Sequence, residues 1–139
     1  MKSAPYVKSG LAFFLVAAIA LGPSPSLWAG DKADPLDGKT FVGEIGEKGK
    51  TEGEYEEKMS FNGGEMVSSA CSTLGFDRFA YTATGNGDVI EFVAEATNPT
   101  EGTLRWEGVV KGDTLRATSV WRKPGAPLEE TWLTAKLQE

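Results

Sequence analysis

The sequence predicts an all-β domain: an eight-stranded antiparallel up-and-down meander closed into a small barrel. After Asp37 the chain shows almost no helical periodicity. Turn signals rich in Gly, Asn, Asp and Pro recur about every 8 to 12 residues, which is typical of a barrel or sandwich. The runs between them alternate apolar with charged side chains, as in Ile90, Glu91 and Phe92, and this is the pattern of a half-buried strand.

Eight runs are expected as strands because each lies between two turn signals. They are Thr40–Glu47, Glu54–Phe61, Glu65–Thr73, Arg78–Thr84, Val89–Thr97, Thr103–Val110, Leu115–Arg122 and Glu129–Leu137. All the connections are short, and short connections join antiparallel neighbours. Sequential hairpins favour a barrel, and Gly43 and Gly108 inside strands supply kinks for closure. A β-sandwich is the alternative fold.

The turn chemistry also predicts strand register. Turns at Asn86-Gly87, Asn98–Gly102 and Gly112-Asp113 join the last strands. The pairs expected from these turns are Tyr81 with Phe92, Ala83 with Ile90, Trp106 with Ala94, Phe92 with Gly108, Glu95 with Arg105, Leu104 with Trp121 and Trp106 with Ser119. This register keeps every apolar face on one side, and a slip of one residue would break it.

Two strands remain ambiguous in the sequence. A two-residue Asn62-Gly63 turn directs Ser68, Ala70 and Ser72 inward, whereas a three-residue turn directs Val67, Ser69 and Cys71 inward. The last strand buries either Leu133, Ala135 and Leu137 or Glu130 and Trp132.

The first 29 residues are expected to be a secretory signal peptide, which leaves residues 30–139 as a single β-barrel domain. Lys2 and Lys8 precede an apolar run, Leu11–Leu21, that is too short to span a bilayer. Cleavage is expected after Ala29, or alternatively after Ser26. The protein is therefore expected to be exported, either to the periplasm of a bacterial envelope or outside the cell, with no membrane span after cleavage.

Composition excludes several classes of function. The formal charge of −6 becomes −8 once the two leader lysines are removed, which argues against nucleic-acid or anionic-membrane partners. The chain has no histidine, which removes Ser-His-Asp catalysis and most zinc sites. The single cysteine, Cys71, has no intramolecular partner for a disulfide and is expected to be buried. We therefore expect no enzymatic activity, no cofactor and no metal.

Three segments carry a family resemblance. They are Leu36-Asp37-Gly38-Lys39-Thr40-Phe41, the stretch from Ser68 through Cys71 to Gly75-Phe76, and Trp106-Glu107-Gly108 followed by Lys111-Gly112-Asp113. In these segments the chain resembles small exported bacterial lipocalin-like proteins of uncharacterised function, within the calycin-type barrels. The similarity spans Leu36 to Leu137 and lies in turn and core positions. It implies a fold, and it brings no catalytic residue.

The candidate site is the lumen of the barrel. Six rings share the predicted inner face: Phe61, Phe79, Tyr81, Phe92, Trp106 and Trp121. They either fill an eight-stranded lumen or leave room for one small ligand. Small residues at 68–73 favour a cavity opposite the tryptophans. The expected ligand-binding residues are Ser68, Ser72, Tyr81, Phe92, Trp106 and Trp121.

Two hypotheses of different classes follow. The first is a non-enzymatic barrel that binds a small amphipathic or hydrophobic ligand in its lumen. The second is an interaction protein with a solid core, such as an inhibitor or an envelope accessory, that acts through its loops. A pocket of a few hundred Å³ would favour the first hypothesis, and a filled lumen would favour the second.

Overall fold

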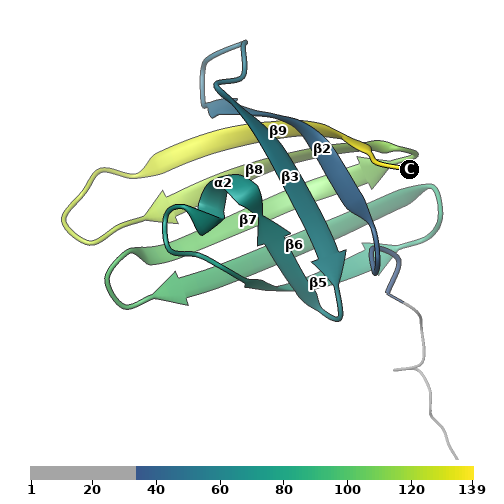
Figure 1. Cartoon of the computed structure of the whole chain (residues 1–139), viewed down its shortest axis with the longest axis horizontal. Coiled ribbons are helices and arrows are strands. Elements are labelled where there is room, and N and C mark those ends of the chain that lie inside the picture. Colours follow the sequence, from purple (N-terminus) through teal and green to yellow (C-terminus); the bar gives the residue numbers. More distant parts are fainter. Residues whose placement is uncertain (1–33) are drawn as a thin grey trace, which may run out of the picture. The chain divides into compact units, whose positions relative to one another are not determined.

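The structure is a computed structural model that describes residues 34–139, so the expected signal peptide lies outside the described residues. Eight antiparallel strands follow one another around a closed barrel, in which the last strand pairs with the first. The strands are β2 (Thr40–Glu47), β3 (Tyr55–Asn62), β4 (Glu65–Ser68), β5 (Phe79–Gly85), β6 (Val89–Asn98), β7 (Gly102–Lys111), β8 (Thr114–Arg122) and β9 (Glu129–Leu137). The predicted up-and-down barrel is confirmed (Figure 1).

One element differs from the sequence prediction. The expected strand over 65–73 ends at Ser68, and the chain continues as a helical turn, α2 (Ser69–Ser72). The Ser68 side chain caps this turn by accepting a hydrogen bond from the backbone N–H of Cys71. Gly75, with a positive φ of 99°, then redirects the chain toward β5.

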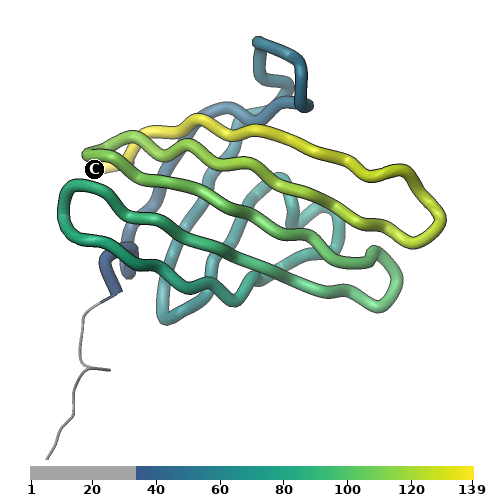
Figure 2. Tube along the Cα trace, turned by 180° about the vertical axis from the view of Figure 1, so that it is seen from behind, coloured from purple at the N-terminus to yellow at the C-terminus, as the bar shows by residue number. Residues whose placement is uncertain are grey.

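The predicted register holds on one side of the barrel. Trp106 lies opposite Ala94 in β6 and opposite Ser119 in β8, and Glu95 pairs with Arg105. The further predicted pairs of Phe92 with Gly108 and Leu104 with Trp121 are also present. These long strands run side by side across the molecule (Figure 2).

The predicted register of the β5–β6 hairpin is wrong by two residues. Tyr81 lies opposite Ala94, not Phe92, and Ala83 lies opposite Phe92, not Ile90. The side-chain oxygen of Asn86 accepts the N–H groups of Asp88 and Val89, and this turn is longer than the expected two-residue one. A shift of two residues preserves the faces, so the apolar side chains still point inward.

The β3–β4 hairpin also turns one residue later than expected. Asn62 pairs with Glu65, so Gly63 and Gly64 form the turn, both with positive φ. A two-residue turn remains, and Ser68 points inward as one of the two alternatives predicted. In β9 the buried set is Leu133 and Ala135, with Leu137 partly covered, so Trp132 lies on the other face.

The two ends of the barrel are filled differently. Toward the start of β2, Leu36 is fully buried and Phe61 makes edge contacts with the rings of Phe41, Tyr81 and Phe92 at centroid distances of 5.0 to 6.1 Å. Edge-to-face packing of this kind fills space tightly, so these rings close one half of the lumen. The other end of the lumen is open to a pocket.

Candidate functional site

The pocket lies at the end of the barrel where β2 and β8 end and where β3, β7 and β9 begin. Its volume is about 570 Å³. The barrel contributes apolar lining from Ile45 on β2, Leu104 and Trp106 on β7, and Trp121 on β8. Ser119 of β8 adds a hydroxyl, which is hydrogen-bonded to the hydroxyl of Thr131.

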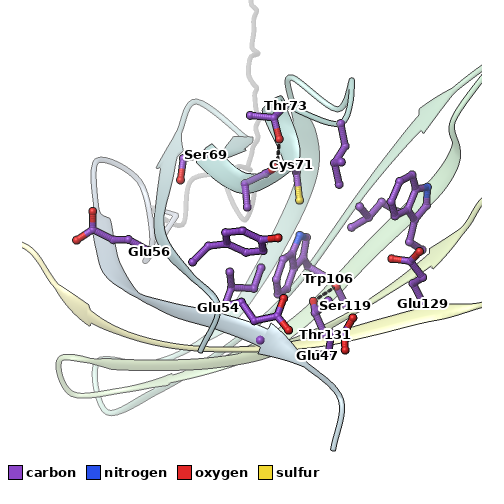
Figure 3. A pocket seen from close by; sticks show the side chains of 17 residues that line it. Glu47, Glu54, Glu56, Ser69, Cys71, Thr73, Trp106, Ser119, Glu129 and Thr131 are labelled. Atoms are coloured by element: carbon purple, nitrogen blue, oxygen red, sulfur yellow. Dashed lines mark hydrogen bonds between the residues drawn. The ribbon is translucent and has the colours of Figure 1, made fainter. Parts of the chain in front are cut away.

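The opposite wall of the pocket is α2 with the residues that follow it. Ser69, Ala70 and Cys71 line the cavity, and Cys71 stands directly across from Trp106 (Figure 3). Three of the small residues at 68–73 thus line the same cavity as the two tryptophans, from a helical turn and not from a strand. The tighter rise of a helix brings these consecutive residues close together over the barrel opening.

A buried carboxylate holds α2 in place. Glu57 on β3 is fully buried, and it accepts hydrogen bonds from the hydroxyls of Ser68 and Ser69 and from the backbone N–H of Ala70. The Ser69 and Ala70 bonds are both 2.9 Å long. A buried charge is tolerated when donors of this kind surround it. The three bonds therefore fix the position of the pocket wall.

Two buried polar groups lie at the inner end of the pocket. The indole N–H of Trp106 points toward the Cys71 thiol (Figure 3), but it is the one buried side-chain polar atom of residues 34–139 without a hydrogen-bond partner. Burial raises the pKa of the Cys71 thiol to about 11, and the nearby Glu57 adds to this, although Ser68 and Trp106 act in the opposite direction. Cys71 is therefore a protonated thiol at neutral pH.

The mouth of the pocket is partly apolar. The side chain of Tyr55 is 66% exposed, and Leu74 after α2 is 38% exposed. Trp121 is anchored there, because its indole N–H donates to the carbonyl oxygen of Glu101 at 2.6 Å and its ring meets Phe76 edge-on at 6.0 Å. Exposed apolar side chains gathered around an opening are typical of a binding site.

Of the six residues predicted for the site, Trp106 and Trp121 line this pocket. Ser68 lies behind the wall, bonded to Glu57, and the hydroxyl of Ser72 donates to the carbonyl oxygen of Ser68. Phe92 belongs to the filled half of the lumen.

Tyr81 is the sixth predicted residue, and it also lies in the filled half. Its hydroxyl donates to the carboxylate of Asp34. Burial and this carboxylate raise the pKa of the tyrosine well above its usual range.

The sequence reasoning missed most of the pocket wall. Leu104 belongs to the predicted inner face, Ile45 is not among the expected site residues, and the sequence leaves two orientations open for Cys71. The helical turn that brings Cys71 to the pocket has a signal in the sequence, namely a Ser at the N-cap and a Gly after the last turn. The long run of small polar residues obscured it.

Comparison of the chain with protein-family models, with curated proteins and with solved structures finds no match. The structure itself defines the class of protein: a closed eight-stranded antiparallel barrel, compatible with a calycin-like fold, with a pocket at one end. Within residues 34–139, no helix is long and apolar enough to cross a membrane.

Proposed function

We propose that this protein is a non-enzymatic barrel that binds a small amphipathic or hydrophobic molecule in the pocket between α2 and strands β7 and β8. The observation that carries the proposal is the pocket itself. Its volume of about 570 Å³ falls within the usual range for small-molecule sites. Its lining combines apolar side chains such as Leu104 and Trp106 with a few hydroxyl groups, as such sites generally do.

The chemistry of the pocket argues for binding over catalysis. Cys71 is the strongest nucleophile near it, but its raised pKa leaves very little thiolate at neutral pH. The Ser68 hydroxyl is fully buried and already donates to Glu57. Neither group is both activated and accessible, and a nucleophile needs both properties.

The proposal also includes export of the protein and its relationship to lipocalin-like barrels. The charged start and the short apolar run of the first 29 residues support a cleaved signal peptide and a place in the bacterial envelope. The barrel topology supports kinship with the small lipocalin-like proteins that the sequence resembles. Intact-mass measurement of the protein purified from its own host tests the first part, since a mature species that still begins at Met1 contradicts it.

Native mass spectrometry of that same preparation tests the binding function directly. A bound small molecule appears as an added mass that is lost on denaturation. The variant Ala70→Phe places a ring into the pocket from α2 and should abolish the added mass. The matched control is Ala80→Phe, on the exposed face of β5, which should retain it.

Failure of this test has a defined meaning. If no small molecule accompanies the protein and Ala70→Phe leaves the binding of added amphiphiles unchanged, the pocket is not a ligand site. The solid-core alternative, in which the loops contact a partner, would then be preferred.

A further inference from the structure

The charged residues that line the pocket all carry the same sign. They are Glu47 at the end of β2, Glu54 and Glu56 near the start of β3, and Glu129 at the start of β9. Among residues 34–139, no lysine or arginine lines this pocket. When the mouth of a pocket is partly enclosed and lined by charges of one sign, the electrostatic potential there is strong. Such a mouth attracts ligands of the opposite charge.

These four carboxylates are not equally free. Glu47 lies 3.5 Å from the ammonium group of Lys50, and Glu56 points away from the cavity (Figure 3). Glu54 and Glu129 form no ion pair with any other residue of the described range 34–139. They are therefore the two carboxylates most available to a ligand.

Aromatic rings accompany these carboxylates at the mouth. Tyr55 and Trp121 line the pocket. The Trp121 ring already attracts one cation, because the ammonium group of Lys123 lies 5.5 Å from its centroid. Rings next to carboxylates are the usual surroundings of bound organic ammonium groups, since the negative face of the ring and the carboxylate both favour positive charge.

The inner end of the pocket limits how deeply a ligand enters. The indole N–H of Trp106 is fully buried and points toward the Cys71 thiol (Figure 3), so a ligand atom does not reach it in this structure. Polar recognition of a ligand therefore depends on the groups at the mouth of the pocket.

We propose that the ligand is an organic cation, with its ammonium group at the mouth that Glu54 and Glu129 line from its two sides and its apolar body in the pocket beside Trp121. This inference rests on the proposed binding function and names the class of its ligand.

Three probes with the same decyl chain separate charge from hydrophobicity: decyltrimethylammonium, decanol and decanoate. Each is titrated into the purified protein below its micelle or solubility limit, and binding is followed by tryptophan fluorescence and by calorimetry. The cation should bind about tenfold tighter than the carboxylate at low ionic strength. The gap should narrow in about 0.5 M salt, where charges at the mouth are screened.

The double variant Glu54→Gln, Glu129→Gln tests whether these two carboxylates cause the preference. It should weaken binding of the cation by about three- to tenfold and leave decanol almost unchanged. The control is Glu91→Gln, an exposed carboxylate on β6 outside this pocket, which should behave like the native protein.

The outcomes distinguish this inference from the function on which it rests. If decanol or decanoate binds as tightly as the cation, or if the double variant keeps the native preference, the charge inference is wrong while the pocket remains a binding site. If none of the three probes binds, the proposed function fails and the inference fails with it.

Discussion

Ser68 donates its hydroxyl hydrogen to the carboxylate of Glu57, and both side chains are fully buried where β4 passes into α2. The same Ser68 oxygen accepts the backbone N–H of Cys71, so one hydroxyl links the buried charge to the helical turn. The pocket wall is therefore positioned by a polar network behind it. Such networks are stable only when every member is satisfied.

Removing the Glu57 carboxylate should release this network. Glu57→Ala leaves two hydroxyls and the Ala70 N–H without their acceptor, and it should lower the free energy of unfolding by about 2 to 4 kcal/mol. Glu57→Gln keeps one acceptor oxygen and should cost about half as much. Urea unfolding followed by tryptophan fluorescence measures both. The exposed neighbour Glu56→Ala is the control, and an equal midpoint for Glu57→Ala and Glu56→Ala would contradict the network.

Gly108 should be intolerant of a side chain because the Phe92 ring lies across it. A Cβ at this position would come within 2.5 Å of a ring carbon of Phe92 and 2.8 Å of the Cβ of Ala117. Gly108→Ala should therefore lower stability by about 1 to 3 kcal/mol, the usual range for overpacking. Gly87→Ala is the matched control, since nothing lies within 4 Å of its Cβ and its φ is not positive. Thermal unfolding of the two variants should separate them clearly, and similar midpoints would place Phe92 elsewhere.

The fold was predictable because its signals are local. Alternation with a period of two identified seven strands to within one residue at each end. It placed Trp106 on the inner face, where the residue is buried. It left two alternatives for the last strand, and the structure shows the one that buries Leu133. The β5–β6 register was missed by two residues because the Asn86 side chain enlarges the turn. The assignment of side chains to the inner or outer face stays correct despite this error, because a shift of two residues leaves each side chain on the same side of the sheet.

The pocket was less predictable because depth along a barrel axis has no periodic signal. Parity placed Tyr81, Phe92, Trp106 and Trp121 on one inner face, but Tyr81 and Phe92 lie in the filled half and the tryptophans at the pocket. The helical turn α2 has a local signal in its capping serine, but Glu57, 12 and 13 residues away from its partners Ser69 and Ala70, holds the turn in place over the pocket. A contact of this kind is not visible in the local sequence.

Trp106 should be the largest single contributor to the core near the pocket. Its side chain is fully buried between Ala94 and Ser119, so Trp106→Ala should cost about 3 to 5 kcal/mol. Trp132→Ala is the control, because Trp132 lies on the outer face of β9 and should cost clearly less. Chemical unfolding curves of both variants provide the measurement. A Trp106→Ala midpoint at or above that of Trp132→Ala would show that the inner face is misassigned.

Cys71 should react slowly with thiol reagents in the native protein. The thiol is buried, and its pKa of about 11 leaves roughly 0.1% thiolate at pH 8. Labelling with a chromogenic disulfide reagent should therefore be slow before unfolding and fast in urea. Native labelling at the rate of an unstructured thiol peptide would show that Cys71 is exposed, and a dimerisation or redox role would then need to be considered.

The raised pKa of Cys71 should also make the fold sensitive to alkali. Its pKa is about 11 in the folded chain and near 9 when unfolded, so folding favours the protonated thiol. The stabilisation is fully present below pH 9 and is lost as the pH rises toward 11, by about 2 to 3 kcal/mol in total. Ionisation of Tyr81 also lowers the stability of the fold, at higher pH, because the pKa of this tyrosine is raised as well.

The variant Cys71→Ala separates the contribution of Cys71 from that of Tyr81. The stability of this variant should fall less steeply between pH 9 and 11 than that of the native protein. Parallel curves of unfolding free energy against pH for the two proteins would contradict a buried, neutral thiol.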